Sequence, residues 1–472
     1  MKLPARLRRW SSEWGVCRRK EGVMLSDSAL LAWDAVWRNA GFALSAAESA
    51  DTLFVVLGVL LWVGLPVAGV WFGVKAMRLR RLVRELPTCK AKGVFVGQVE
   101  MKGDAVSEAP LASFLAEAPC VWYEYSVEEH WRRVRVETYT DSKGNVRTRT
   151  RVDTGWETVA SDKAWQSFFL QDDTGAVLVH PAGAEVEPVQ VFSRQCSMGD
   201  PLYYGKGPSG SVSGSTHERR FTERAIPEGQ RLYLLGTARE RKDCAAAEVA
   251  KAGFAEDVFL ISCRSEDEIA RSSGWKSWLY PVGGGCALLL GTILLADGVP
   301  PGALKALLVQ LAAYFMLVWL CAAGWTMYAG MVRMRNRVQA AWAMIEVQLQ
   351  RRHSLVPDLV RVVEGYAAYE RQLQEDVALL RAGQAGAAAF RMRAEAFPEL
   401  KADAVFAELS GRLVDAEDRV ALAREYFNTL AGHFNAAVSR FPDVLFARVC
   451  GMKAAALWRP DDAGAVARPP QV

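Results

Sequence analysis

The sequence lacks the paired cysteines on which zinc sites and disulfide frameworks depend. Its nine cysteines are an odd number, scattered singly from Cys17 to Cys450 without one C-x-x-C pair. Zinc ribbons and RING domains need closely spaced cysteine pairs, and small disulfide-rich domains need an even set. The sequence therefore excludes both classes and favours a reducing compartment.

Motifs for catalysis are lacking as well. His217-Glu218 is followed by Arg219-Arg220-Phe221, so no H-E-x-x-H motif is formed, and the five histidines lie far apart. No G-x-x-x-x-G-K-[ST] phosphate loop occurs. The net charge of +4 gives no global signal for nucleic acid. We expect a protein that is not an enzyme, with no cofactor, no metal and no nucleic-acid partner.

Long apolar runs, by contrast, are present. Residues 52–75, 277–296 and 306–332 each form a stretch long enough to cross about 30 Å of hydrocarbon as a helix, so we predict three transmembrane helices. The second run is rich in glycine and could instead be a buried core helix. Residues 1–51 form a basic tail without a signal-peptide pattern, and Met24 is an alternative start.

Basic residues flank the predicted spans unevenly. Lys75, Arg78 and Arg80 follow the first span, and Arg333 and Arg335 follow the third. Because lysine and arginine accumulate on the cytoplasmic side, we expect both soluble regions in the cytoplasm.

Residues 92–265 alternate apolar and polar residues in short runs rich in β-branched and aromatic side chains, which predicts a β-rich domain. Three segments, Pro119–Tyr125, Phe168–Gly175 and Ala225–Gly236, make this region resemble the GIDE domain of MULAN-type ubiquitin ligases. Ligase activity in that family is associated with a separate RING, which this chain lacks. Gln171-Asp172-Asp173 is interpreted as a β-turn and the run KGPSGSVSGS as an exposed insertion.

An arginine-rich hairpin is predicted around the turn sequence DSKGN. Side chains alternate along a strand, so Arg133 and Arg135 share one face of the first strand, and Arg147, Arg149 and Arg151 share one face of the second. The five arginines are candidate contacts for anionic lipid headgroups. The alternative is a solvated hairpin whose charges prevent aggregation.

Residues 333–458 show helical periodicity, and the third span is predicted to continue into them without a break. Pro357 is expected to kink this helix or to begin a second one. A heptad pattern recurs between Leu409 and Phe441, with Phe427 and Phe434 on its large column and Ala416 and Ala423 on its small column. This predicts an antiparallel helical bundle over residues 333–458, in which the heptad helix ends at Phe441-Pro442, before a disordered tail at 459–472.

This region resembles the LemA family over nearly its whole length. The matching residues stand in the order and spacing of the family: Arg335-Asn336, Ala341-Trp342, Val347-Gln348-Leu349, Arg351-Arg352, Leu355-Val356-Pro357, Gly365-Tyr366, Tyr426-Phe427-Asn428 and Phe434-Asn435. Glu346, Ser354 and Asp358 depart from the family pattern. The resemblance implies a membrane-anchored helical scaffold and supplies no mechanism.

Five polar residues of this region are candidate protein-interaction residues: Gln348, Arg351, Arg352, Asn428 and Asn435. Asn428 and Asn435 follow seam phenylalanines and could face the glutamine and arginines of the first helix. One interpretation is a polar network that fixes the helix register. The other is a polar groove that captures a peptide or a chain terminus.

We therefore expect an α+β multidomain membrane protein of the bacterial inner membrane, acting as a scaffold or adaptor through protein or lipid contacts. A component of a ubiquitin-ligase-like or degradative system is an alternative. A pore or membrane-remodelling protein, made by homo-oligomerisation of the span hairpin, is a second alternative.

Overall fold

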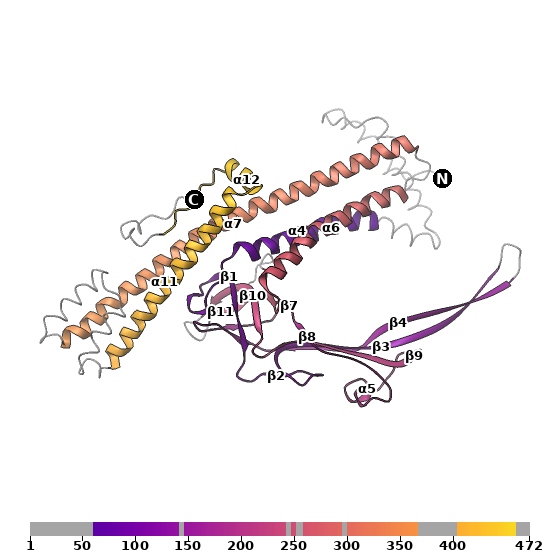
Figure 1. Ribbon diagram of the computed structural model, residues 1–472, viewed down its shortest axis with the longest axis horizontal. Coiled ribbons are helices and arrows are strands. Elements are labelled where there is room, and N and C mark those ends of the chain that lie inside the picture. Colours follow the sequence, from indigo (N-terminus) through magenta and orange to yellow (C-terminus); the bar gives the residue numbers. More distant parts are fainter. Residues whose placement is uncertain are drawn as a thin grey trace, which may run out of the picture. The chain divides into compact units, whose positions relative to one another are not determined.

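A computed structural model describes residues 60–140, 146–241, 247–251, 258–294, 300–366 and 404–458 (Figure 1). The chain divides into two compact units. The first contains the residues up to Arg80 together with Arg271–Ala329, and the second contains Arg81–Ala270 together with the chain from Gly330 onward. The predicted mixed α+β class is confirmed. The predicted tails at 1–51 and 459–472 and the DSKGN turn lie outside the described residues.

The first unit is helical. It contains the π-helical turn η1 (Leu60–Gly64) and parts of three helices, α4 (Leu65–Glu85), α6 (Glu266–Leu294) and α7 (Pro301–Tyr366). Gly69 of α4 faces Gly284 of α6 so closely that a Cβ on Gly69 would lie 2.6 Å from the Tyr280 carbonyl oxygen. Small residues at such crossings let helix backbones approach, as in membrane helix pairs.

Two of the described helices, α6 and α7, are long and apolar enough to cross a membrane. Of the most apolar 18-residue stretch in each helix, only 22% in α6 and 17% in α7 is buried, so most of this apolar surface faces outward. The prediction of three spans is not reproduced within the described residues. The first predicted span begins outside them, and the part from Leu60 to the charge at Lys75 is too short for a full crossing.

The second unit contains a closed five-stranded barrel. Strands β1 (Gly97–Val106), β5 (Phe168–Gln171), β6 (Ala176–Val179), β11 (Ala247–Ala250) and β10 (Arg231–Glu240) pair in that order, and β10 pairs back onto β1. Only β6 and β11 are parallel within this ring. Taken in chain order, the ring reads 1-2-3-5-4-1, the Greek-key order of an OB-fold barrel. Two further strands, β12 (Leu260–Ser262) and β7 (Glu185–Glu187), extend the sheet from β10.

The barrel encloses an apolar core because residues of one parity along β1 and β10 point inward. Val99 and Met101 of β1 and Leu232 and Leu234 of β10 are all at most 1% exposed. Residues of the other parity, such as Glu100, lie on the outer face of the barrel.

A second sheet is inserted between β1 and β5 and continues after β7. It contains β2 (Leu111–Ala112), β3 (Pro119–Thr140), β4 (Val146–Trp165), β8 (Val189–Ser197) and β9 (Ser215–Pro227), and the short helix α5 (Pro201–Gly205) lies between β8 and β9. Beyond Trp131, β3 pairs only with β4, so the two strands form a ribbon that projects from the sheet (Figure 1).

A fully buried ion pair ties this sheet to the loop before β9. Arg219 of β9 lies directly opposite Glu129 of β3, and its Nη2 donates to Glu129 Oε2 at 2.8 Å. Arg219 also donates to the carbonyl oxygens of Tyr203, Pro208 and Gly210 at 2.6–2.8 Å. The predicted insertion KGPSGSVSGS is therefore held on its inner side by a buried guanidinium, although many of its side chains are exposed.

Two long antiparallel helices complete the second unit: the part of α7 from Gly330 onward, and α11 (Ala404–Ser439). Trp342 packs on Phe427, whereas Arg352, further along α7, bonds Glu417, which is earlier in α11. The predicted continuity of the third span into this region is confirmed, because α7 is one helix. A second helix does not begin at Pro357, which lies inside α7. The short helix α12 (Asp443–Val449) follows α11.

The heptad pattern predicts the buried face of α11 correctly from Leu413 to Phe434. Leu413, Ala416, Val420, Phe427 and Phe434 are at most 4% exposed. Phe441, expected to be the last member of this column, is 75% exposed, because α11 ends at Ser439 and the chain turns into α12.

We predict that Arg219→Met lowers the unfolding free energy of the β-rich region by about 3–5 kcal/mol, because Glu129 would remain buried without a cation. Denaturant unfolding of the detergent-solubilised chain, followed by fluorescence, measures this. Arg220→Met is the matched control: its pair with Glu128 is partly exposed, and a loss of at most about 1 kcal/mol is expected. Equal effects of the two substitutions would contradict the role of the buried pair.

Candidate functional site

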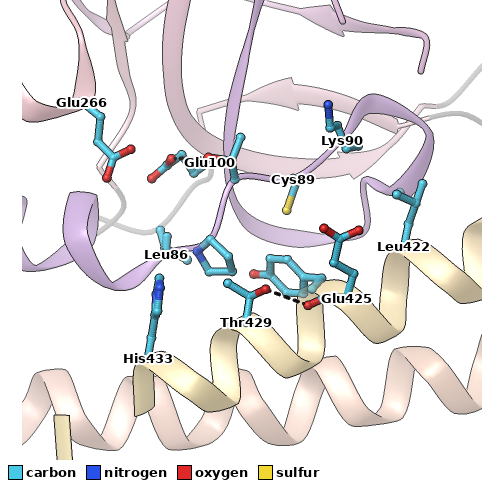
Figure 2. A pocket seen from close by; sticks show the side chains of 13 residues that line it. Leu86, Cys89, Lys90, Glu100, Glu266, Leu422, Glu425, Thr429 and His433 are labelled. Carbon is cyan, nitrogen blue, oxygen red and sulfur yellow. Dashed lines mark hydrogen bonds between the residues drawn. The ribbon is translucent and has the colours of Figure 1, made fainter. Parts of the chain in front are cut away.

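A cavity of about 300 Å³ lies in the second unit between the barrel and α11 (Figure 2). One wall is the segment Leu86–Lys90 that follows α4, and a second is formed by Glu100 of β1 and Glu266 of α6. The third wall is the face of α11 from Leu422 to His433. The cavity thus collects residues from three parts of the chain that are far apart in sequence: the stretch 86–100, Glu266 and the face of α11.

Glu100 is the most strongly buried carboxylate of this cavity, at 1% exposure. Thr88 Oγ1 and the Tyr233 hydroxyl each donate to it at 2.9 Å, and Lys102 Nζ lies 3.5 Å from its Oε1. Burial raises the pKa of Glu100 to about 7, although the hydrogen bonds from Tyr233 and Thr88 act in the opposite direction. Glu100 therefore titrates near neutral pH.

Cys89 lies beside Glu100 and is not a nucleophile. Burial first, and the Glu100 carboxylate second, raise the pKa of the Cys89 thiol to about 12, so the reactive thiolate is not populated at neutral pH. Within the described residues, no three His, Cys, Asp or Glu side chains are grouped as a metal site requires.

Tyr426 of α11 closes the cavity and joins two hydrophobic cores. Its ring packs against the barrel core, where it meets Phe95 edge-on at a centroid distance of 4.7 Å, and also against the core between α7 and α11. Its hydroxyl hydrogen-bonds with Cys89.

Polar contacts surround this tyrosine. Lys92 Nζ pairs with Asp418 at 2.7 Å and with Asp415 at 3.1 Å, and His433 Nδ1 bonds the Glu85 carbonyl oxygen at 3.1 Å. The barrel and the long helices are therefore joined by apolar packing with a charged rim.

The structure does not bring the five candidate protein-interaction residues together. Asn428 and Asn435 do not face the glutamine and arginines of α7. Asn428 hydrogen-bonds with the main chain of Trp458, and Asn435 with the main chain of Ala455. Each follows a seam phenylalanine by one residue, a rotation of about 100° around the helix that turns it away from the seam.

The three candidates on α7 have separate environments. Arg352 pairs with Glu417 at 3.2 Å, while Arg351 is exposed. Gln348 lines a second, open cavity of about 710 Å³ beside the barrel, and its Oε1 is buried without a hydrogen-bond partner among the described residues.

The arginine ribbon has the register that the sequence analysis required. Arg135 lies opposite Arg151, Arg133 opposite Asp153, and Arg149 opposite Glu137, so these positions share one face. The side chain of Arg147 is outside the described part of the chain. Acidic residues dilute the charge: Arg151 Nε lies 3.2 Å from Asp153, and Arg133 Nη2 lies 3.7 Å from Glu157. The opposite face carries the exposed aliphatic residues Val134, Val136, Val146 and Val152.

Sequence reasoning missed Glu100 and Tyr426. Glu100 lies on the outer face of a strand, where alternation predicts solvent, but Thr88, Tyr233 and Glu266 lie around it. Tyr426 precedes Phe427 in the heptad pattern and was included in the LemA resemblance, but no local signal shows that it reaches a second core.

We predict that Glu100→Gln flattens the pH dependence of stability. A folded-state pKa near 7, above the ordinary 4.5, means that the native state holds its proton longer than the unfolded state. The contribution of protonated Glu100 to the unfolding free energy is therefore fully present below pH 4.5 and is lost as the pH rises through 7, by up to about 3 kcal/mol. Thermal unfolding from pH 5 to pH 8 measures this. Asp104→Asn removes an exposed charge from the same strand as a control, and an unchanged profile for Glu100→Gln would contradict the prediction.

Two family models match the chain. One, GIDE, described as E3 Ubiquitin ligase, matches residues 136–295, and the other, the LemA family, matches residues 341–394 and 383–472. No curated protein and no solved structure gives a match. The order of the two matches is the order of the two resemblances in the sequence. The matches therefore bear out the resemblance of the chain to a GIDE domain followed by a C-terminal LemA-family domain.

Proposed function

We propose that this protein is a membrane-anchored scaffold in which the GIDE barrel and the LemA helices act as one docked module. The observation that carries the proposal is the position of Tyr426, which packs into both cores at once. A module that is docked in this way presents a fixed surface to partners, as an adaptor needs. No step of chemistry is required of its residues.

The anchor in this proposal is the pair of apolar helices α6 and α7. Their outward-facing apolar side chains, including Trp278, Leu317 and Trp325, suit a lipid environment. Further along α7, Arg333, Arg335 and Arg337 follow the apolar stretch. By the positive-inside rule this supports a cytoplasmic position for the soluble regions. The proposal further places the protein in a bacterial inner membrane, with the segment before Lys75 as a third span.

The family description supports a second candidate, a role in ubiquitin-like conjugation. That role needs a zinc-binding RING or a partner that brings one. The zinc content of the purified protein, alone and after recovery with its partners, separates the two candidates.

We predict that reporter fusions after residues 200 and 460 both report the cytoplasm. The two positions lie in the soluble regions on either side of the α6–α7 pair, and two crossings return the chain to its starting side. Alkaline phosphatase fusions should be inactive and fluorescent-protein fusions active at both positions. Fusions that report opposite sides of the membrane would rule out the proposed topology.

We predict that Tyr426→Ala separates the barrel from α11 without unfolding either. Removing a packed aromatic ring costs about 3–5 kcal/mol, comparable with the whole docking energy of a small contact. Hydrogen exchange should rise in residues 86–96 and 422–433, with little change in the barrel strands. Tyr426→Phe keeps the ring and serves as the control, with exchange close to that of the natural protein. Unchanged protection from hydrogen exchange in Tyr426→Ala would contradict the docked-module proposal.

A further inference from the structure

The segment Met452–Trp458 lies extended against α11. Met452 and Ala455 are buried and Trp458 is half-buried, whereas the residues between them are exposed. The buried positions recur every third residue, which is the period of a polyproline-type extended chain. All three pack against the core between α7 and α11.

Two asparagine side chains hold the main chain of this segment. Asn435 Oδ1 accepts from the Ala455 N–H at 2.7 Å, and its Nδ2 donates to the Ala455 carbonyl oxygen at 2.9 Å. Asn428 makes the same pair of bonds with Trp458, at 2.8 and 3.2 Å. Each amide thus bonds a residue through both its N–H and its C=O, as a neighbouring β-strand does.

The spacing of the two amides matches an extended chain. Seven residues of α-helix advance about 10.5 Å, and three residues of extended chain advance about 9–10 Å. Because the contacts are with main-chain atoms, they select an extended conformation rather than a particular sequence. Side-chain selection is left to the positions that are buried.

The end of the groove at Trp458 is imperfectly filled. The guanidinium of Arg424 stacks on the Trp458 ring at 3.9 Å, but Arg424 Nε and Trp458 Nε1 are both buried without a hydrogen-bond partner among the described residues. Burial first, and the nearby Arg352 second, lower the pKa of Arg424. The next residue in the sequence is Arg459, which has the same charge as Arg424.

We propose that this groove is a binding site for an extended segment of a partner protein, and that residues 452–458 are a displaceable internal ligand of it. The partner segment has a small residue opposite Asn435, an aromatic residue three positions later, and a carboxylate beside the aromatic ring that pairs with Arg424. A second copy of this chain does not supply that carboxylate next to the aromatic residue, because the residue that follows Trp458 in the sequence is Arg459. The inference rests on the scaffold role only for its biological use, since peptide binding is measured independently of Tyr426 docking.

The test measures anisotropy of two labelled peptides added to the detergent-solubilised full chain. One peptide is residues 451–460, and the other is the same peptide with Arg459→Glu. Two independent substitutions open the groove without changing the helices: Trp458→Ser removes the aromatic anchor, and Ala455→Pro removes the N–H that bonds Asn435. We expect the Glu-bearing peptide to bind both opened chains at least about tenfold more tightly than the natural chain.

The same peptides test which groups form the site. Adding Asn435→Ala to either opened chain should weaken binding about tenfold, whereas adding Asn336→Ala, at an exposed position of α7, should leave it unchanged. Methylation of the peptide nitrogen at position 455 should have the same effect as Asn435→Ala. The Glu-bearing peptide should bind about fivefold more tightly than the natural one, with the difference lost at high ionic strength.

Three results would overturn the proposal. Equal binding with and without Asn435 would show that the peptide lies elsewhere. Equal binding by the natural and opened chains would show that residues 452–458 do not compete for the groove. Equal binding of the two peptides would remove the carboxylate from the partner's description.

Discussion

The packing of one tyrosine ring into two hydrophobic cores is the contact on which the second unit depends. Besides Tyr426, the described residues join the barrel and the long helices through the ion pairs of Lys92, a few polar contacts and the packing of Leu422 on Gly93, and exposed ion pairs are worth little. With it, apolar surface from both domains is removed from water at a single point. The ion pairs of Lys92 with Asp415 and Asp418 lie beside this apolar contact.

Two buried carboxylates in this unit show how differently the same group can be held. Glu129 faces a guanidinium across a strand pair, so burial is offset by a full opposite charge and several hydrogen bonds, and its pKa lies below the ordinary value. Glu100 has hydroxyl donors and only a more distant lysine, so burial prevails and its pKa rises. The first arrangement is permanent at physiological pH, whereas the second titrates within the physiological range.

The sequence predicted the elements well wherever a periodic pattern was long. The heptads of α11, the unbroken course of α7 and the shared face of Arg133 and Arg135 all follow from spacing that repeats along the element. The barrel closure did not follow, because its strands are short and β1 and β10 are separated by more than a hundred residues. The predicted contacts of Asn428 and Asn435 with α7 were also wrong, because a one-residue offset from the seam directs a side chain to another surface of the helix. Glu100 could not be identified, because the groups around it, among them Thr88, Tyr233 and Glu266, come from separate parts of the chain.

The continuity of α7 has a mechanical consequence. Its apolar stretch and the half that packs on α11 share one uninterrupted hydrogen-bond ladder, with Pro357 well beyond most of that interface. A helix of this kind resists twisting, so a turn of its apolar half about the helix axis is passed on to the face that carries Val338, Trp342 and Ile345. Rotation by the angle of a single residue, about 100°, would take those side chains out of register with Phe427.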